Sequence, residues 1–251
     1  MSIVKVENLS FAYKDNLILN DINFEIKEGE TFGLVGNSGS GKSTIALILL
    51  KLLKNYNGKV YIEDKDISLI KRKKDLKAFY NNVQIVFQDP YSSLDSKRTV
   101  GYQIEEPLII HRNCTKKERS LRVEQIMELV GLDVKYRNAY PHQLSGGLRQ
   151  RLAIAIALVL NPKFIVLDEC VSALDISIQA GILNLLNELK TKLNLTFLFI
   201  SHDLNVVGYI CDRIAVLNDG NIVEIQNSED LFKNPIDSYT KKLFNNSYYE
   251  L

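Results

Sequence analysis

Apolar residues along this chain fall into two kinds of segment, which alternate with one another. The short kind includes Phe164–Leu167 and Phe197–Ile200, which are continuously apolar, as buried parallel strands usually are. Ile3–Leu9 and Ile18–Ile26 instead show the partial alternation of half-buried strands. The longer kind carries apolar residues at helical spacing. Strands that alternate with helices predict an α/β fold.

The predicted elements cover most of the chain. The predicted strands are Ile3–Leu9, Ile18–Ile26, Thr31–Val35, Lys59–Glu63, Val83–Phe87, Phe164–Leu167, Thr196–Ile200, Arg213–Leu217 and Asn221–Ile225. The clear helices are Lys42–Leu53, Lys116–Val130, Gly147–Leu160, Ile176–Leu193 and Asp203–Cys211. Helical patterns dominate from about residue 89 to residue 158, which indicates a helical insertion in a single domain over residues 1–251.

Composition narrows the class of protein. The chain has 251 residues, of which 46% are hydrophobic and 24% charged, as is ordinary for a soluble globular protein. A formal net charge of +1 excludes a global basic field for nucleic acid or an anionic membrane, but allows a local phosphate site. The most apolar stretches, Ile45–Leu53 and Leu152–Leu160, fall short of the roughly 20 residues of a membrane span. The basic run Lys71–Lys74 is flanked by aspartates and is expected on a solvated face.

Two further features bear on the compartment. The first residues mix acidic and basic side chains without an apolar core, so we expect no signal peptide and a cytoplasmic protein. Cys114, Cys170 and Cys211 are far apart in sequence, which favours free thiols in a reducing compartment.

A glycine-rich loop carries the strongest chemical signal. The loop follows the predicted strand Thr31–Val35 and opens a helix, and it reads Gly36-Asn37-Ser38-Gly39-Ser40-Gly41-Lys42-Ser43-Thr44. This is the context that the pattern G-x-x-x-x-G-K-[ST] requires, because glycines let successive N–H groups form an anion nest at a helix N-terminus. We expect Lys42 to reach the β- and γ-phosphates of a nucleotide and Ser43 to ligate Mg²⁺. A glycine-rich turn without a ligand is the alternative.

Two adjacent carboxylates end a predicted strand. Asp168 and Glu169 follow the apolar run Phe164–Leu167. Ionised carboxylates at the end of a buried strand cost free energy unless a cation or hydrogen bonds compensate. Beside the phosphate loop, Asp168 would hold Mg²⁺ and Glu169 would orient the attacking water. The alternative is a helix N-cap with an acidic first turn.

Five further landmarks occur in order along the chain. They are Tyr13, Gln88, the motif Leu144-Ser145-Gly146-Gly147-Leu148, the segment Ser172–Asp175 and His202. Each is weak alone, and Tyr13 could be a core aromatic at a strand end. Together with the phosphate loop they make the chain resemble the ATP-binding cassette (ABC) ATPases over nearly its whole length.

The resemblance implies a role for each landmark. Tyr13 matches the aromatic residue that stacks on adenine, and Gln88 matches the glutamine that senses the γ-phosphate and Mg²⁺. His202 matches the histidine that contacts the γ-phosphate. The signature motif of the family matches Ser145, Gly146 and Gly147. In the head-to-tail dimer of that family, the signature of one subunit closes over the ATP that the other subunit holds. The segment Ser172–Asp175 crosses the dimer interface.

The family also implies a fold and a branch. The fold is a P-loop NTPase of the α/β class, with an antiparallel β subdomain and an inserted α-helical subdomain, and the cofactors are ATP and Mg²⁺. The segments that resemble the importers of oligopeptides, dipeptides and nickel are Gln88–Asp95, Glu106–Leu108, Tyr140–His142 and Ser238–Lys241. Such an ATPase is peripheral to the cytoplasmic face of the membrane and binds no nucleic acid. Its partners are two permease subunits, a second and usually different ATPase and, indirectly, an external substrate-binding protein.

The chain departs from the family pattern at two positions, and two other functions remain as alternatives. Leu148 stands where the signature usually has glutamine, and Cys170 stands where proline usually follows the catalytic glutamate. The long C-terminal extension with clustered cysteines of some members is absent from this sequence, so no iron–sulfur site is expected. A soluble ABC ATPase of DNA repair or translation is the first alternative, although long heptad repeats and a second cassette are lacking. An exporter ATPase is the second.

Overall fold

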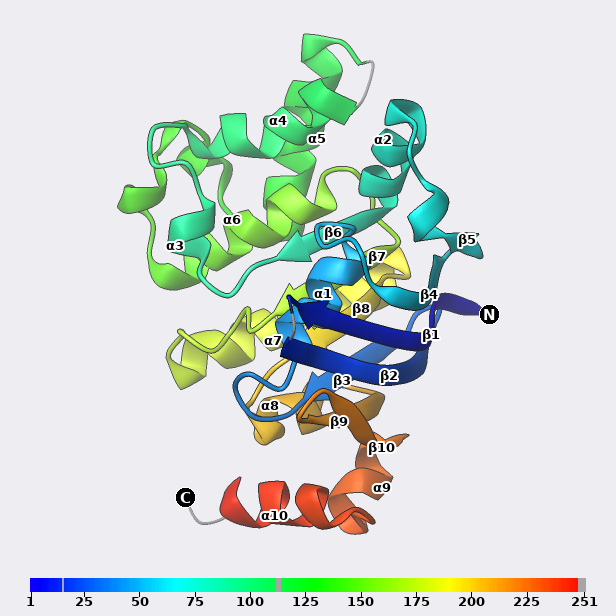
Figure 1. The fold of residues 1–251 in the computed structure, drawn as a ribbon. Coiled ribbons are helices and arrows are strands. Elements are labelled where there is room, and N and C mark those ends of the chain that lie inside the picture. Colours follow the sequence, from blue (N-terminus) through cyan, green and yellow to red (C-terminus); the bar gives the residue numbers. More distant parts are fainter. Residues whose placement is uncertain (15, 112–113, 248–251) are drawn as a thin grey trace. The chain divides into compact units, whose positions relative to one another are not determined.

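The structure is a computed structural model that describes residues 1–14, 16–111 and 114–247. The chain forms two compact units (Figure 1). The first unit comprises Met1–Arg72 and Asn194–Leu251, and the second comprises Lys73–Leu193.

An antiparallel sheet occupies the N-terminal part of the first unit. Its strands, in spatial order, are β2 (Asn16–Lys27), β1 (Ser2–Tyr13), β4 (Asn57–Ile62) and β5 (Lys65–Asp66). Burial alternates along the second half of β2, where Phe24 is buried while Asn23 and Glu25 are exposed. This alternation produces one buried and one solvated face, as an antiparallel sheet allows.

A second sheet of the first unit is mostly parallel. Its strands here run in the order β10 (Asn221–Asn227), β9 (Arg213–Asn218), β3 (Thr31–Val35) and β8 (Thr196–Ile200). β3 is parallel to both of its neighbours, whereas β9 and β10 are antiparallel. Every residue of β3 and β8 is buried, as expected for central parallel strands. The residues after β3 therefore leave the middle of the carboxyl edge of the sheet.

Helices pack around these strands within the first unit. They are α1 (Lys42–Leu49), α8 (Leu204–Ile210), α9 (Ser228–Lys233) and α10 (Ser238–Ser247), with a short 3₁₀ helix over Ile67–Leu69. α8 approaches β3 so closely that a Cβ at Gly33 would lie 2.9 Å from Cys211 Sγ and 3.0 Å from Val207 Cγ1. Glycine at this position thus permits the close packing of helix on strand.

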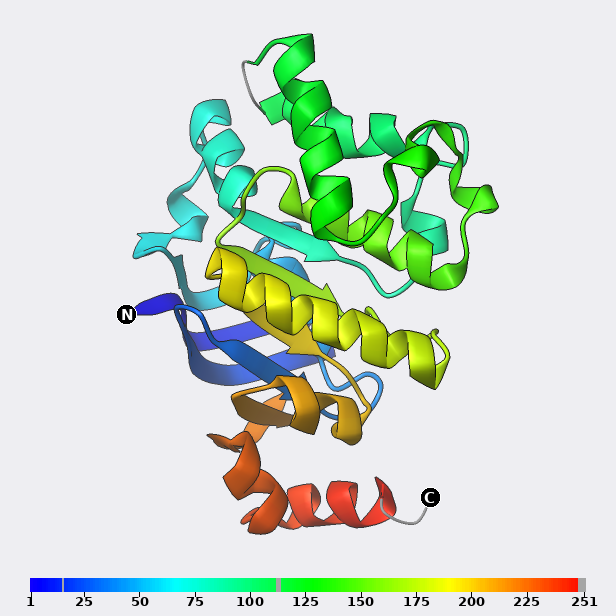
Figure 2. The ribbon, with the colours of Figure 1, turned by 180° about the vertical axis from the view of Figure 1, so that it is seen from behind.

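The second unit combines two parallel strands with a set of helices (Figure 2). The strands are β6 (Val83–Val86) and β7 (Phe164–Asp168). The helices are α2 (Lys73–Asn82), α3 (Pro90–Ser93), α4 (Val100–His111), α5 (Lys116–Leu129), α6 (Gly146–Leu158) and α7 (Ile176–Leu193), with 3₁₀ helices over Val134–Asn138 and Pro141–Gln143. Between β6 and β7 the described residues form helices and loops only.

Most predicted elements are present, with shifted ends. β3, β8 and α7 have the predicted bounds, whereas β1 and β2 extend beyond theirs. The prediction that the first helix runs to Leu53 is wrong: α1 ends at Leu49, and the N–H groups of Leu52 and Leu53 donate back to Leu47 O in a closing turn. The helix predicted from Asp203 starts at Leu204, because Asp203 is its N-cap.

The structure also bears on the basic run and on the absence of a predicted membrane span. The basic run Lys71–Lys74 is exposed, and its last two residues begin α2. Among the described residues, no helix combines the length and the apolar character needed to cross a bilayer. The side chains of residues 90 and 91, which follow Gln88, lie outside those that the structure describes.

Candidate functional site

The phosphate loop lies at the carboxyl end of β3, in the first unit. Gly41 caps α1 with a left-handed backbone (φ of 109°), and a Cβ there would lie 2.6 Å from Leu19 Cδ2. A Cβ at Gly36 would lie 2.1 Å from the carbonyl oxygen of Leu217 on β9. Only glycine fits at these two positions, so the loop can curl against the neighbouring strand.

Burial is uneven along the loop. The exposed residues are Asn37, Ser38, Gly39 and Ser43, the buried ones are Gly36, Ser40, Gly41 and Lys42, and Thr44 is half-buried. The buried Ser40 hydroxyl has no hydrogen-bond partner among the described residues. A buried polar group of this kind is costly unless a ligand satisfies it. The loop thus fits an anionic ligand such as the phosphates of a nucleotide.

Lys42 holds the loop from inside. Its Nζ donates hydrogen bonds of 2.8 Å to the carbonyl oxygens of Gly36 and Asn37, while its aliphatic stem is buried. The two bonds join the helix start to the loop start. The positive charge therefore sits within the curl of the loop, where it complements phosphate.

His202 leaves the same edge of the sheet as the loop. β8 is the parallel neighbour of β3, with Ile200 opposite Leu34, so residues just past each strand lie side by side. Ser201 N donates to Leu34 O at 3.4 Å, and Ser201 Oγ accepts from Asp203 N at 3.0 Å. His202 itself is exposed, which suits contact with a ligand bound at the loop.

Tyr13 ends β1 in the same unit. Its side chain is 48% exposed, and its ring meets Phe11 edge to face at 4.8 Å between centroids. The exposure argues against a core aromatic and leaves ring surface available for stacking.

The second unit brings Gln88 and Glu169 together. Gln88 Nε2 donates a hydrogen bond of 2.7 Å to Glu169 Oε2. β6 and β7 are parallel with Val86 opposite Leu167, so the two side chains follow paired positions at the same sheet edge. Asp168, the last residue of β7, is half-buried beside them. An amide, a glutamate and an aspartate thus gather at one end of this strand pair.

Glu169 has an unusual backbone. Its φ is 46°, in the left-handed region that costs a non-glycine residue about 1–2 kcal/mol. Its carbonyl oxygen accepts hydrogen bonds from Ser172 Oγ at 2.9 Å and from Ser172 N at 3.2 Å. Strain of this kind is common at functional sites, and the turn to Ser172 maintains it here.

Cys170 is buried directly after Glu169, with 1% of its surface exposed. Burial raises the pKa of its thiol to about 12, so the thiol is protonated near neutral pH. This cysteine acts as a small apolar residue where the family usually has proline.

The signature residues begin α6. Ser145 is the N-cap, and its Oγ accepts from Leu148 N at 3.4 Å, so the helix starts at Gly146 rather than at the predicted Gly147. A Cβ at Gly147 would lie 2.7 Å from Ile178 Cγ2 on α7. Glycine here serves helix packing. The departing residue, Leu148, is half-buried.

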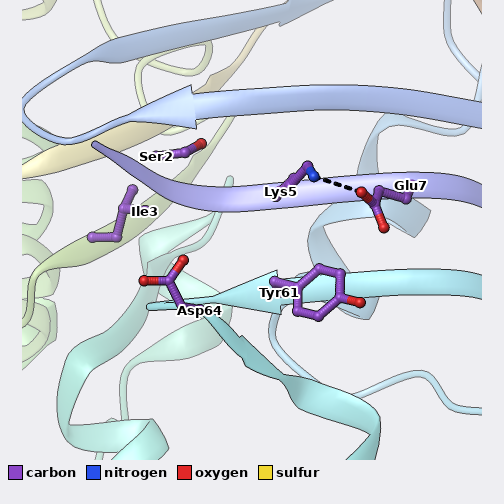
Figure 3. A pocket seen from close by; sticks show the side chains of 6 residues that line it. All are labelled: Ser2, Ile3, Lys5, Glu7, Tyr61 and Asp64. Atoms are coloured by element: carbon purple, nitrogen blue, oxygen red, sulfur yellow. Dashed lines mark ion pairs between the residues drawn. The ribbon is translucent and has the colours of Figure 1, made fainter.

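Outside the predicted residues, the described part of the chain offers a pocket to consider. Among the described residues, no group of three or more His, Cys, Asp or Glu side chains is arranged to hold a metal ion. A pocket of about 250 Å³ lies on β1 and β4, and none of its lining residues belongs to the predicted site (Figure 3). Its lining includes the ion pair between Lys5 Nζ and Glu7 Oε1, at 2.6 Å.

One contact at the phosphate loop had no sequence signal. The hydroxyl oxygen of Tyr239, on α10, accepts a hydrogen bond of 3.2 Å from Asn37 N. The sequence indicated Tyr239 only through the resemblance of Ser238–Lys241 to one branch of the family. Neither the spacing of motifs nor the hydrophobic periodicity relates Tyr239 to Asn37, which lies 202 residues earlier in the chain.

Comparisons with known proteins identify the family of this chain. The ABC transporter family profile matches residues 19–172. The oligopeptide transport ATP-binding protein OppF of Bacillus subtilis is 46% identical over 226 residues, which are 90% of this chain and 74% of that protein. The solved structure of cbiO1 from Clostridium perfringens, part of the ABC transporter complex cbiONQ, superposes with a TM-score of 0.84 at 30% identity, over 93% of this chain and 91% of that one.

A second solved structure is similar to the chain. It is a dimer of the ATP-binding cassette MJ0796 in a post-hydrolysis state with ADP and Pi, with a TM-score of 0.79 and 32% identity over 90% of this chain and 98% of that one. The mixed α/β fold with an antiparallel sheet is the fold that the sequence predicted. From the family profile, the close relative and the solved cassettes together, the chain belongs to the ABC transporter family, as its ATP-hydrolysing component.

Proposed function

We propose that this ATPase drives the import of peptides through partner permeases. The observation that carries the proposal is the 46% identity to an oligopeptide transport ATP-binding protein along 90% of the chain. The sequence motifs after Gln88 favour the same branch of the family. Nickel or a metal chelate is the other cargo class of that branch, and the uptake experiment below separates the two.

The phosphate loop is the proposed seat of the ATP phosphates. Backbone N–H groups of residues 36–44, apart from that of Asn37, which donates to Tyr239, bind the β- and γ-phosphates together with the Lys42 ammonium. Tyr13 stacks on the adenine. His202 contacts the γ-phosphate from the neighbouring strand end. Ser43 and Asp168 hold Mg²⁺, with Gln88 as a further contact. Mg²⁺, when bound, neutralises charge on the β- and γ-phosphates.

Glu169 is the proposed base for hydrolysis. Its carboxylate accepts the proton of the attacking water, whose oxygen bonds to the γ-phosphorus while the bridging oxygen leaves with ADP. The hydrogen bond from Gln88 holds one oxygen of that carboxylate and so orients it. Gln88 thereby links the state of the nucleotide to the helical segment that follows it.

The working assembly has more than one chain. The helix start at Ser145, Gly146 and Gly147 would close over the ATP of a second ATPase subunit, as a head-to-tail dimer requires. The dimeric cassette structure with ADP and Pi supports this arrangement. We assign residues 1–251 to one ATP-binding domain, with residues 89–158 as the helical insertion that meets two permease subunits at the cytoplasmic face of the membrane.

Two measurements test this function. Affinity-tagged chain, purified from detergent-solubilised membranes of its own host, should retain two permeases and a second ATPase. Deletion of its gene should abolish uptake of a labelled tripeptide and leave ⁶³Ni uptake intact. Normal peptide uptake with lost nickel uptake would overturn the peptide assignment, and recovery without any permease would overturn the transporter assignment.

A further inference from the structure

The C-terminal helix of the first unit is bonded to the phosphate loop. Tyr239, in the first turn of α10, accepts the Asn37 N–H through its hydroxyl oxygen at 3.2 Å. Asn37 directly follows Gly36 at the start of the loop, and its own carbonyl oxygen accepts from Lys42 Nζ. Lys42 therefore holds the carbonyl oxygens of the peptide groups on both sides of Asn37, and Tyr239 holds the N–H of the group before it.

Two acidic residues hold the start of α10, which carries Tyr239. Asp237 Oδ1 accepts from Tyr239 N at 2.7 Å and from Thr240 N at 3.3 Å, which fixes the first turn of α10. Glu224, on β10, accepts from Ile236 N at 2.8 Å and from Asp237 N at 3.0 Å. The tyrosine thus projects from an ordered turn bonded to the sheet.

The same part of the fold contacts the loop a second time. Gly220 N, in the turn between β9 and β10, donates to Ser40 O at 3.1 Å. β10 then carries Glu224, which holds the start of α10. The loop is therefore tied at Asn37 and at Ser40 to one continuous C-terminal segment.

We propose that Tyr239 is a positioning residue of the ATP site, whose hydroxyl sets the first turn of the phosphate loop and couples nucleotide binding to the docking of α10. The inference rests on the proposed role of the phosphate loop in binding ATP. Because coupling between two equilibria is reciprocal, ADP or ATP in the loop must strengthen the docking of α10 by the factor that docking strengthens nucleotide binding.

The first test removes only the hydroxyl. Tyr239→Phe keeps the ring and deletes one hydrogen-bond acceptor, so we expect affinity for MgADP to fall about three- to tenfold, as for one hydrogen bond. The KM for ATP should rise by a similar factor with little change in kcat, because saturating ATP orders the loop by itself. Tyr61→Phe is the matched control, since Tyr61 lies in the same unit on β4, beside the pocket of Figure 3.

The second test reads the coupling at the helix. In the full 251-residue wild-type chain, MgADP should slow amide hydrogen exchange in α10, and Tyr239→Phe should abolish that slowing. Asp237→Ala, which removes the cap of α10, should also reduce MgADP affinity. Wild-type MgADP affinity in Tyr239→Phe, or α10 exchange that ignores MgADP in the wild type, would overturn the proposal.

A third variant separates this inference from the function on which it rests. Lys42→Met should lose MgADP binding altogether, whereas Tyr239→Phe should only weaken it. Full MgADP affinity in Lys42→Met would reject the phosphate-loop assignment itself. Lost binding in Lys42→Met with unaltered binding in Tyr239→Phe would reject only the role of Tyr239.

Discussion

Gln88 Nε2 donates a 2.7 Å hydrogen bond to Glu169 Oε2, and the two residues follow the adjacent parallel strands β6 and β7. The bond holds one oxygen of a glutamate whose backbone is already in the left-handed region, with φ of 46°. The backbone strain and the side-chain bond together restrict where the carboxylate points. A base that is oriented before its substrate arrives does not lose conformational entropy by being ordered during the reaction.

Deleting the Gln88 side chain should slow hydrolysis without preventing ATP binding. In Gln88→Ala the Glu169 carboxylate loses its donor, so we expect kcat to fall about 10–100-fold, as for other residues that orient a catalytic group. Phosphate release and equilibrium ATP binding measure the two effects. Gln84→Ala is the control, because Gln84 lies on β6, the strand just before Gln88, but bonds to Tyr80 O. Equal losses in both variants would contradict a specific role for Gln88.

Neutralising Glu169 should trap ATP. Glu169→Gln keeps the size of the side chain but cannot accept a proton, so the hydrolysis rate should fall roughly 10²–10⁴-fold. ATP remains bound, and the dimer that it holds together should accumulate in size-exclusion chromatography with light scattering. The same variant with ADP should stay monomeric. Brisk turnover by Glu169→Gln would remove Glu169 from the role of base.

The sequence predicted those parts of the site that follow directly from strands. The apolar runs of β3 and β8 have clear ends, so the sequence placed the phosphate loop directly after a predicted strand, whereas His202 was assigned by resemblance to the family. The meeting of Gln88 and Glu169 depends on the register of β6 with β7, which no local pattern determines. The left-handed backbone of Glu169 is equally invisible, because this conformation is imposed by the surrounding turn rather than by the residue type.

The remaining differences have a local cause in one case and a long-range cause in the other. Lys51 and the residues after it were predicted to be helical from their apolar spacing, but the chain turns there, with φ of 58° at Lys51. Tyr239 reaches Asn37 only because Glu224 and Asp237 hold the start of α10. Such long-range contacts depend on the complete fold, so periodicity could not reveal them.

Removing the charge of Lys42 should abolish stabilisation by ATP. Lys42→Met retains the buried stem but loses two hydrogen bonds to loop carbonyls, at a cost of about 1–3 kcal/mol in the free energy of unfolding. ATP raises the melting temperature of the wild type by mass action, and this rise should vanish in the variant. Differential scanning fluorimetry with and without MgATP measures it. Unchanged ATPase activity would contradict the assignment of the phosphate loop.

Two glycines of the loop should differ sharply in their tolerance of alanine. A Cβ at Gly36 would lie 2.1 Å from Leu217 O, so Gly36→Ala must displace backbone and should cost about 3 kcal/mol or more. Gly39 has nothing within 4 Å of a Cβ, and Gly39→Ala meets only the strain of a φ of 80°, about 1–2 kcal/mol. Urea unfolding of both variants measures the difference. Equal destabilisation would mean that the loop does not pack against β9 in solution.

Glu224 should make the stability of the chain depend on pH. Burial alone would raise the pKa of this carboxyl, but hydrogen bonds from Ile236 N, Asp237 N and the Gln226 amide outweigh burial and lower the pKa below its ordinary value of 4.5. A carboxyl whose pKa is lower in the folded state stabilises that state above the unfolded pKa. This contribution is lost as the pH falls through the lowered, folded value.

Glu224→Gln should therefore be less stable than the wild type at pH 7, by about 2 kcal/mol, because the amide replaces an accepting oxygen with a donor that faces an N–H group. The difference in unfolding free energy, measured by urea titration, should shrink as the pH falls below 4.5 and Glu224 becomes protonated in the wild type. Glu229→Gln is the control, since Glu229 is exposed on α9 and pairs with Lys233 at the surface, where ion pairs contribute little. A difference that stays constant with pH would show that the charge of Glu224 does not hold the turn before α10.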